Sequence, residues 1–135
     1  MNAKDKKIRV LLTKSQLDGH DRGVRYVARK LREAGMEVIF TRYRNTNEIV
    51  NSALQEDVDV IGISFSVGGH TVVSAEVIKS LKEKNIGSIP IIIGGIIPGD
   101  DMAELREMGV SGVFGPGSSA SEIIDHMSTH ANKGL

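Results

Sequence analysis

The sequence predicts an α/β fold in which a parallel five-stranded sheet carries helices on both faces. Short apolar runs alternate with longer amphipathic runs along the chain, which is the pattern of repeated strand–helix units. The run at residues 58–64 has the β-branched density of a central strand buried on both faces. Glycines gather after the apolar runs, where strand-to-helix loops are expected. Right-handed crossovers then make the sheet parallel.

Each element follows from its local pattern. The expected strands cover residues 8–13, 36–40, 58–64, 90–93 and 112–114, and the expected helices cover residues 24–34, 47–55, 73–84, 101–108 and 120–130. Gly35 and Gly109 stop the first and fourth helices. Thr46 is the expected N-cap of the second helix and Asp100 that of the fourth.

Five such units favour the flavodoxin-like (Rossmann-like) three-layer sandwich with strand order 2-1-3-4-5. This order reverses between the first and third strands, and ligands bind in α/β sheets at such a reversal. His20 and Ser64 follow these two strands, so both should face the same crevice. The absence of side-chain bulk at several loops of this edge indicates a slot for a large ligand, although each glycine alone is an ordinary turn residue.

Composition excludes several classes of protein. The 135 residues suit one domain, 1–135, with a polar tail at 1–7 and a frayed end at 131–135. Seventeen basic and seventeen acidic side chains cancel, so nothing points to nucleic acid as a partner. With no cysteine, no disulfide or thiolate site is possible. No secretion signal or bilayer-spanning run is present, so we expect no membrane association and a cytoplasmic protein.

The loop after the first strand carries the candidate chemistry. Asp18 precedes His20 by two residues, and Gly19 between them allows the chain to fold back. A carboxylate that binds one ring nitrogen fixes the tautomer and leaves the other nitrogen free for a metal. Lys14 is placed to lie behind Asp18 and keep it ionised.

The usual ligands of this fold do not suit the sequence. A phosphate-accepting receiver needs a carboxylate where Ser64 stands, at the end of the third strand. The loop at residues 17–22 lacks the hydroxyl groups of a flavin-mononucleotide phosphate site. The dinucleotide motif G-x-G-x-x-G is missing as well.

The segment Asp18-Gly19-His20-Asp21-Arg22-Gly23 resembles the D-x-H-x-x-G signature of cobalamin-binding domains, in the form typical of methylmalonyl-CoA mutase and related acyl-CoA mutases. Ser64 stands at the serine of the family's S-x-L motif, and Gly94-Gly95 resembles its double glycine. The segment Phe114-Gly115-Pro116-Gly117 resembles its last cofactor loop. The similarity runs from about residue 8 to residue 124.

The resemblance implies a site and a cofactor. His20 would replace the dimethylbenzimidazole of adenosylcobalamin as the lower axial ligand of cobalt, with Asp18 orienting it and Lys14 completing the relay. Ser64 would bond the base of the displaced nucleotide tail. The remaining cofactor contacts implied by the family lie in the four motifs and comprise Gly19, Asp21, Arg22, Gly23, Ser66, Gly68, Gly94, Gly95, Phe114, Gly115, Pro116, Gly117 and Ser118.

Two positions depart from the family pattern. Ser66 stands in place of the leucine of S-x-L, so an apolar contact on the corrin or the tail is lost. Asn47 replaces a proline that relatives often carry after the capping threonine, and this change should matter little.

Other polar residues have ordinary explanations beside functional ones. His70 follows a glycine turn and either approaches the site or simply begins a helix. His126 and His130 have the i, i+4 spacing of a zinc pair but no third ligand, which favours exposed, frayed side chains. The arginines at 22, 25, 29 and 32 favour a solvated helix face, although Arg22 and Arg25 at the helix start are also placed to meet cofactor amides or a partner.

The resemblance implies the cobalamin-binding small subunit of a two-chain acyl-CoA mutase. Its partner would be a large TIM-barrel-type subunit that binds the acyl-CoA, since no residues of this chain remain for such a barrel. Interconversion of methylmalonyl-CoA and succinyl-CoA is the leading reaction, with isobutyryl-CoA or hydroxyacyl-CoA mutases as alternatives. A non-catalytic corrinoid carrier or chaperone is the rival class. Carriers generally have a helical bundle before this domain, and the first strand already begins near residue 8.

Overall fold

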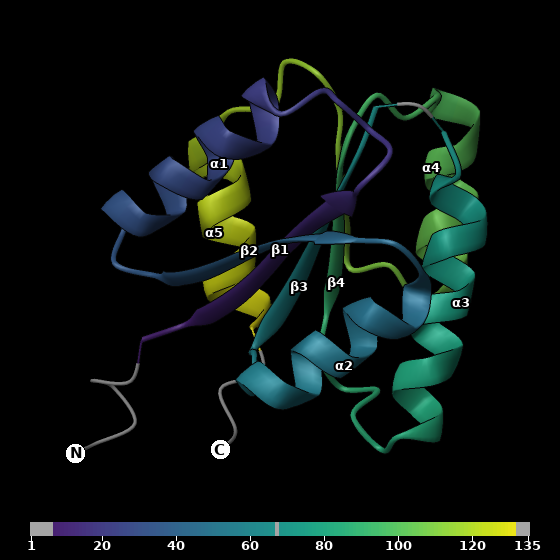
Figure 1. The fold of residues 1–135 in the computed structure, drawn as a ribbon. Helices are drawn as coiled ribbons and strands as arrows, with labels where there is room; N and C mark the ends of the chain where they lie inside the picture. Colours follow the sequence, from purple (N-terminus) through teal and green to yellow (C-terminus); the bar gives the residue numbers. More distant parts are fainter. Residues whose placement is uncertain (1–6, 67, 132–135) are drawn as a thin grey trace.

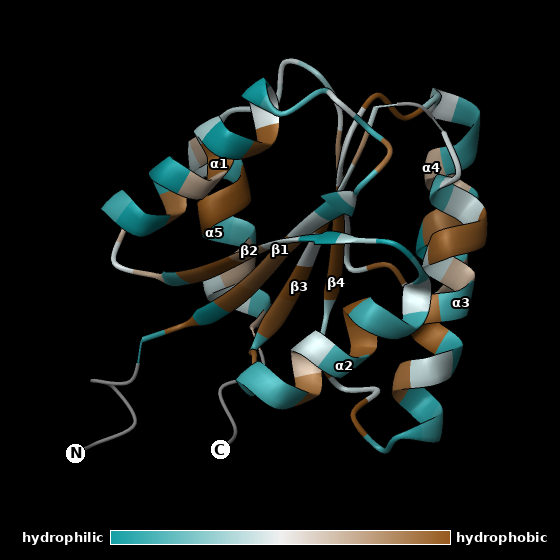
Figure 2. Cartoon of the chain, viewed as in Figure 1, coloured by the Kyte–Doolittle hydropathy of each residue, from teal (hydrophilic) through white to brown (hydrophobic). Residues whose placement is uncertain are grey.

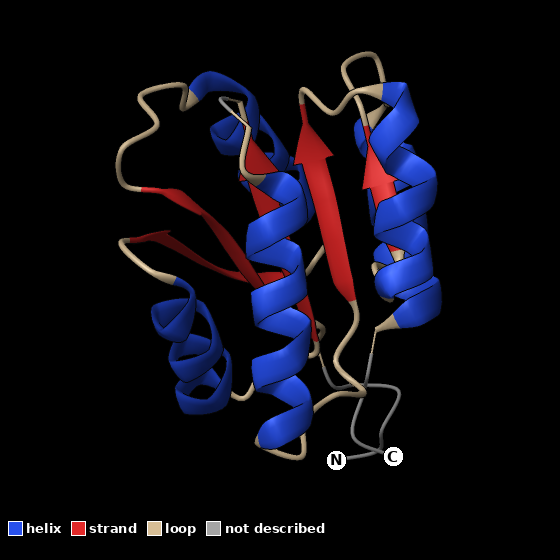
Figure 3. Cartoon of the chain, turned by 90° about the vertical axis from the view of Figure 1, so that its right-hand side faces the viewer, coloured by secondary structure: helices blue, strands red, loops and turns tan. Residues whose placement is uncertain are grey.

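The computed structural model describes residues 7–66 and 68–131, in which strands and helices alternate (Figures 1 and 3). The strands are β1 (Arg9–Ser15), β2 (Glu37–Tyr43), β3 (Val60–Phe65), β4 (Ile91–Gly95) and β5 (Gly112–Phe114). The helices are α1 (Arg22–Glu33), α2 (Thr46–Glu56), α3 (His70–Glu83), α4 (Gly99–Met108) and α5 (Ala120–His130). The element order predicted from the sequence is confirmed.

All strand pairs are parallel, and the sheet has the order β2-β1-β3-β4-β5. The flavodoxin-like prediction is therefore confirmed. β1 lies between β2 and β3, so the chain leaves β1 at the point where the strand order reverses. The loop after β1 and the loop after β3 consequently lie side by side, at the place where this fold binds ligands.

Two apolar cores lie on opposite faces of the sheet, because side chains alternate along each strand. On one face, Leu11, Ile61 and Ile93 pack with residues of α2, α3 and α4. On the other face, Leu12 and Ile92 pack with residues of α1 and α5. Figure 1 shows α1 and α5 together on one side of the strands, and Figure 2 shows hydrophilic residues on the outward surface of α1.

Several elements begin or end differently from the sequence-based expectation. β1 extends to Ser15 because its last residues pair with β2 as far as Tyr43. α1 begins at Arg22 and α3 at His70, two and three residues before the expected starts. Apolar periodicity marks only positions with apolar side chains, so the polar residues that begin α1 and α3 escape it.

Two predicted helix caps are wrong. The N-cap of α2 is Asn45, whose extended backbone lets its side chain accept from the Glu48 N–H, and Thr46 is already helical. Asn47 is accordingly the second residue of the helix. The N-cap of α4 is Pro98, without a side-chain cap, and Asp100 lies inside the first turn. Carboxylates in a first turn still favour the helix electrostatically.

None of the helices in the described ranges is both long and apolar enough to cross a bilayer. The polar tail predicted at 1–7 and the frayed end predicted at 131–135 lie mostly outside the described residues, which leave out 1–6 and 132–135.

Candidate functional site

The loop between β1 and α1 folds back on itself at the carboxyl end of β1. The Asp18 N–H donates to the Ser15 carbonyl over 3.1 Å, and the Gln16 N–H donates to the Tyr43 carbonyl of β2 over 2.9 Å. These bonds turn the chain so that the Asp18 side chain points inward, with 4% of the residue exposed, whereas Leu17 is 95% exposed.

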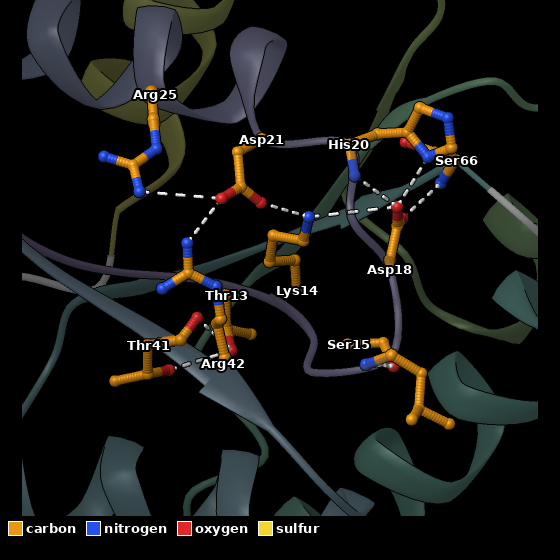
Figure 4. A network of polar contacts seen from close by, with 11 residues as sticks. Thr13, Lys14, Ser15, Asp18, His20, Asp21, Arg25, Thr41, Arg42 and Ser66 are labelled. Carbon is orange, nitrogen blue, oxygen red and sulfur yellow. Dashed lines mark hydrogen bonds and ion pairs between the residues drawn. The ribbon is translucent and has the colours of Figure 1, made fainter.

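Asp18 holds His20 by two bonds to one oxygen, as the sequence predicts (Figure 4). Oδ1 of Asp18 lies 2.9 Å from the His20 backbone nitrogen and 2.8 Å from its Nδ1. The imidazole itself is 73% exposed, while the carboxylate behind it is almost fully buried. The exposed imidazole is therefore held in place by a buried carboxylate.

The surroundings of Asp18 keep its carboxyl ionised, and this determines which ring nitrogen of His20 carries the proton. Burial alone would raise the pKa of Asp18, but bonds from the backbone and ring of His20, with the charge of Lys14, lower it below its usual value. An ionised carboxylate can only accept, so Nδ1 of the neutral ring carries the proton. Nε2 then presents its lone pair, and no described residue bonds to it. This is the arrangement of a histidine metal ligand.

Lys14 lies beside Asp18 within ion-pair distance, as the sequence predicts, but its direct hydrogen bond goes to a second carboxylate. Its ammonium is 2.5 Å from Oδ1 of Asp21 and 3.8 Å from Oδ1 of Asp18, so its direct partner is Asp21. Asp21 also accepts from Arg42 of β2 over 2.5 Å. Bonds from Lys14 and Arg42 lower the pKa of Asp21 to about 2. The sequence-based prediction did not include this second partner, which reaches back to the buried lysine from the start of α1.

A pocket of about 670 Å³ lies beside this loop, between the sheet and helices α1 and α5. Its volume suits a large organic ligand. Thirteen of the site residues predicted from the sequence line the pocket, namely Gly19, His20, Asp21, Arg22, Gly23, Ser64, Ser66, Gly94, Gly95, Gly115, Pro116, Gly117 and Ser118. The structure thus brings all four motifs to one cavity.

Small residues form the floor of the pocket. Strand register places Gly62 between Leu12 and Ile92, and in the next layer it places Ser64 between Lys14 and Gly94. All of these positions face α1 and α5, because strand residues alternate. A Cβ built at Gly94 would meet only the Phe114 carbonyl, at 3.6 Å. The row formed by Gly62, Ser64 and Gly94 has small side chains or none, and this leaves the cavity open.

Sequence reasoning missed most of the apolar lining, which comprises Leu12, Val24, Tyr26, Val27, Gly62, Ile63, Ile92, Ile96, Ile123 and Met127. Gly62 was recognisable as a glycine inside a buried strand, a position that often marks close approach of a ligand. The residues of α1 and α5 carry no such signal, since apolar helix positions usually pack in a core.

Some candidate residues lie elsewhere. Gly68 and Phe114 do not line the pocket. His70 is buried at the start of α3, where Nε2 lies 2.6 Å from Oδ2 of Asp101. The prediction that His126 is exposed and frayed is wrong, since the residue is half-buried and its Nε2 lies 2.9 Å from the Ser111 hydroxyl.

No group of three possible metal-binding side chains occurs among the residues that the structure describes. His126 and His130 are stacked, with ring centres 4.0 Å apart. On the outer face of α1, Arg25 and Arg29 pair with acidic neighbours. Arg22 has no side-chain partner in the described ranges, and it lines the pocket.

The donor set and the cavity fit a cobalt corrinoid that is held through one imidazole. Such a group would need only one ligand with a free lone pair from the protein. His20 offers this ligand at the mouth of the pocket, and the row of Gly62, Ser64 and Gly94 leaves a cradle beside it. Fold and site together define a flavodoxin-like domain built for a large ligand with a metal-ligating histidine at its edge.

Comparison with known proteins places the chain more closely. The profile of the B12 binding domain matches residues 8–125. The chain is 47% identical over 119 residues to the 2-hydroxyisobutanoyl-CoA mutase small subunit of Aquincola tertiaricarbonis, covering 87% of this chain and 88% of that one. It is 44% identical over 126 residues to the pivalyl-CoA mutase small subunit of Xanthobacter autotrophicus, covering 93% and 84%. The chain belongs to the B12-binding domain family, which confirms the predicted cobalamin cofactor.

Longer relatives and solved structures complete the comparison. Human mitochondrial methylmalonyl-CoA mutase is 35% identical over 130 residues, which are 93% of this chain but 17% of that protein. A cobalamin-binding protein from Desulfitobacterium hafniense superposes with a TM-score of 0.75 at 20% identity, over 92% of this chain and 59% of that one. The NarL receiver domain of Mycobacterium tuberculosis gives 0.71 at 16% identity, over 96% and 99%. These two structural likenesses show the fold alone.

Proposed function

We propose that the chain is the cobalamin-binding subunit of an adenosylcobalamin-dependent acyl-CoA mutase, an isomerase that works with a separate large subunit. The observation that carries the proposal is His20, exposed at the pocket with a free Nε2 and held at Nδ1 by a buried carboxylate. When bound, adenosylcobalamin supplies the radical chemistry of such mutases.

The chain's own residues would bind and orient the cofactor. His20 would hold the cobalt through Nε2, and Asp18 would keep Nδ1 of that ring protonated. The pocket beside Gly62, Ser64 and Gly94 would enclose the nucleotide tail. Contacts from the loop at residues 115–118 and from the start of α1 would close this enclosure. The apolar walls of α1 and α5 would exclude water from the tail.

The relatives support the choice of partner and substrate class. Small subunits of 2-hydroxyisobutanoyl-CoA and pivalyl-CoA mutases match at higher identity than human methylmalonyl-CoA mutase. A branched acyl-CoA without a second carboxylate, as in these two relatives, is therefore our proposed substrate ahead of methylmalonyl-CoA, the leading sequence-based expectation. The large subunit would bind the thioester, as expected from the sequence. Its TIM-barrel architecture and the cytoplasmic location stay predictions.

Cobalt ligation can be tested directly on the purified chain. The electron paramagnetic resonance spectrum of bound cob(II)alamin should show coupling to an imidazole nitrogen, and ¹⁵N-histidine labelling should alter that coupling. His20→Ala should abolish it, while His130→Ala, at an exposed helix end, should leave it unchanged. Retention of the cofactor's own benzimidazole on cobalt would refute the proposed ligand.

The mutase function requires a second experiment. The chain is mixed with candidate large subunits, adenosylcobalamin and each acyl-CoA thioester, and isomerisation is followed by product analysis. Turnover that needs both proteins and His20 supports the mutase, and the best substrate identifies the acyl class. Cobalamin binding without turnover in any mixture would favour the corrinoid carrier.

A further inference from the structure

Lys14 and Arg42 are directly opposite each other on neighbouring strands. The β1–β2 register pairs these two residues, so both side chains leave the same face of the sheet at the edge where the cofactor site lies. Like charges at directly opposed positions of a sheet repel each other. An anion between them is needed to offset this repulsion, and Asp21 is that anion.

Asp21 divides its two oxygens between the two cations. Oδ1 accepts from the Lys14 ammonium over 2.5 Å, and Oδ2 accepts from the Arg42 guanidinium over 2.5 Å (Figure 4). Arg25, one turn along α1, lies 3.5 Å from Oδ2 and is more remote. Arg42 is steadied by the ring of Phe40, whose centre is 5.1 Å from the guanidinium carbon.

Lys14 is the connection between this pair and the histidine. Its side chain is fully buried, and its ammonium has two carboxylate neighbours, Asp21 at 2.5 Å and Asp18 at 3.8 Å. The buried ammonium stabilises both the Asp18 and the Asp21 carboxylate, because neither carboxylate is fully hydrated. A second cation on Asp21 weakens the net attraction of that carboxylate for the ammonium, which leaves the ammonium freer to approach Asp18. Asp18 in turn fixes the ring of His20.

We propose that Arg42 is a positioning residue for the cobalt ligand: by binding Asp21 it leaves Lys14 to support the Asp18 carboxylate that orients His20. This inference rests on the proposed function. It adds Asp21 and, from the edge strand β2, Arg42 to the His20–Asp18–Lys14 relay implied by the sequence. The matching control is Arg44, two residues further along, which pairs with Glu48 of α2 and takes no part in the network.

The test measures binding of cob(II)alamin and its imidazole coupling in the wild type and in five variants. Arg42→Gln should weaken binding about tenfold, in the range typical of groups that orient a metal ligand, and should reduce the imidazole-coupled fraction. Arg42→Lys keeps the charge but lacks the forked guanidinium group. Its affinity and imidazole coupling should lie between those of the wild type and Arg42→Gln. Arg44→Gln should match the wild type.

A double mutant separates this mechanism from a general loss of structure. In the Asp21→Asn background the lysine has no competing carboxylate, so adding Arg42→Gln should change affinity and coupling less than twofold. A full Arg42 effect that persists there, or an Arg42→Gln variant equal to wild type, would overturn the proposal. Absence of imidazole coupling in the wild type would instead refute the proposed ligand itself. Thermal unfolding of each variant confirms that it is folded before binding is measured.

Discussion

The backbone N–H of Ser66 donates to Oδ2 of Asp18 over 3.2 Å, so the end of β3 helps to hold the carboxylate that orients His20. The two oxygens of Asp18 are thus divided between the loop that carries the histidine and the next loop of the sheet edge. Because the main chain makes this bond, serine in place of the family leucine at position 66 does not remove it.

The role of Asp18 leads to the first prediction. Asp18→Asn keeps the size of the side chain but removes the charge that Lys14 and the ring of His20 stabilise. We expect cobalamin affinity to fall about 10- to 100-fold, as for other residues that orient a metal ligand, with less imidazole coupling in the cob(II)alamin spectrum. Asp125→Asn, at an exposed position of α5, is the control and should bind like the wild type. Equal affinity of both variants would contradict this role.

The second prediction concerns alanine substitutions of the adjacent Gly94 and Gly95 at the end of β4, one of which should affect ligand binding and the other stability. A Cβ at Gly95 would lie 2.0 Å from the Phe65 carbonyl oxygen, and the backbone φ there is +113°. Gly95→Ala should therefore lower the free energy of unfolding by at least about 2 kcal/mol. At Gly94 the nearest atom is 3.6 Å away, so Gly94→Ala should change stability by less than about 1 kcal/mol.

Gly94→Ala should act on the ligand instead. Its methyl group would enter the floor of the pocket, and overpacking of a close-fitting site costs about 1–3 kcal/mol, or roughly 5- to 150-fold in affinity. Urea unfolding and cobalamin titration of both variants measure the two effects separately. If the Gly94 variant bound cobalamin as tightly as wild type, this row would not be the floor of the cofactor site.

The fold was predictable because its determinants are local or periodic. Alternating apolar and amphipathic runs predict the elements, and the handedness of crossovers restricts their order. The pairing of Asp18 with His20 was also predictable, because the two residues are close in sequence and a glycine between them permits the turn. Periodicity says nothing, however, about the turns of a helix that do not touch the sheet.

Contacts between long side chains from distant segments were not predictable. Arg42 is an exposed position of an edge strand, 21 residues from Asp21, and nothing in its neighbours marks it as part of the site. The choice between Asn45 and Thr46 as N-cap was equally open, since both side chains cap well and only the extended backbone at Asn45 decides it. The division of Lys14 between two carboxylates likewise depends on their three-dimensional placement.

The pair His70–Asp101 leads to the third prediction. Nε2 of the buried histidine lies 2.6 Å from the carboxylate, which joins the first turns of α3 and α4. Asp101→Asn should lower the free energy of unfolding by about 2 kcal/mol, as expected when a charged partner of a buried group is lost. Asp100 lies in the same turn of α4 but is exposed, so Asp100→Asn should cost less than about 0.5 kcal/mol. Chemical denaturation at neutral pH measures the free energy of unfolding of both variants. Equal decreases for Asp101→Asn and Asp100→Asn would mean that these carboxylates act only through the helix dipole.

The last prediction concerns the pH dependence of stability through His126. Burial lowers the pKa of this imidazole below its usual value of 6.5, and the charge of the stacked His130 lowers it further. The unfolded chain therefore takes up a proton here at a higher pH than the folded protein does. The stabilising contribution of the neutral ring is complete above pH 6.5 and declines as the pH falls from there toward the lower pKa of the folded state.

Urea unfolding between pH 8 and pH 5 tests this sign. The free energy of unfolding of His126→Gln should fall less steeply below pH 6.5 than that of the wild type, since glutamine has no proton to take up and can still bond the Ser111 hydroxyl. His130→Gln removes the neighbouring charge, together with the stacked ring, but keeps the imidazole of His126, so its pH profile should lie between those of the wild type and His126→Gln. A wild-type profile that is flat, or that rises toward acid relative to His126→Gln, would mean that the folded protein accepts the proton on this ring as readily as the unfolded chain.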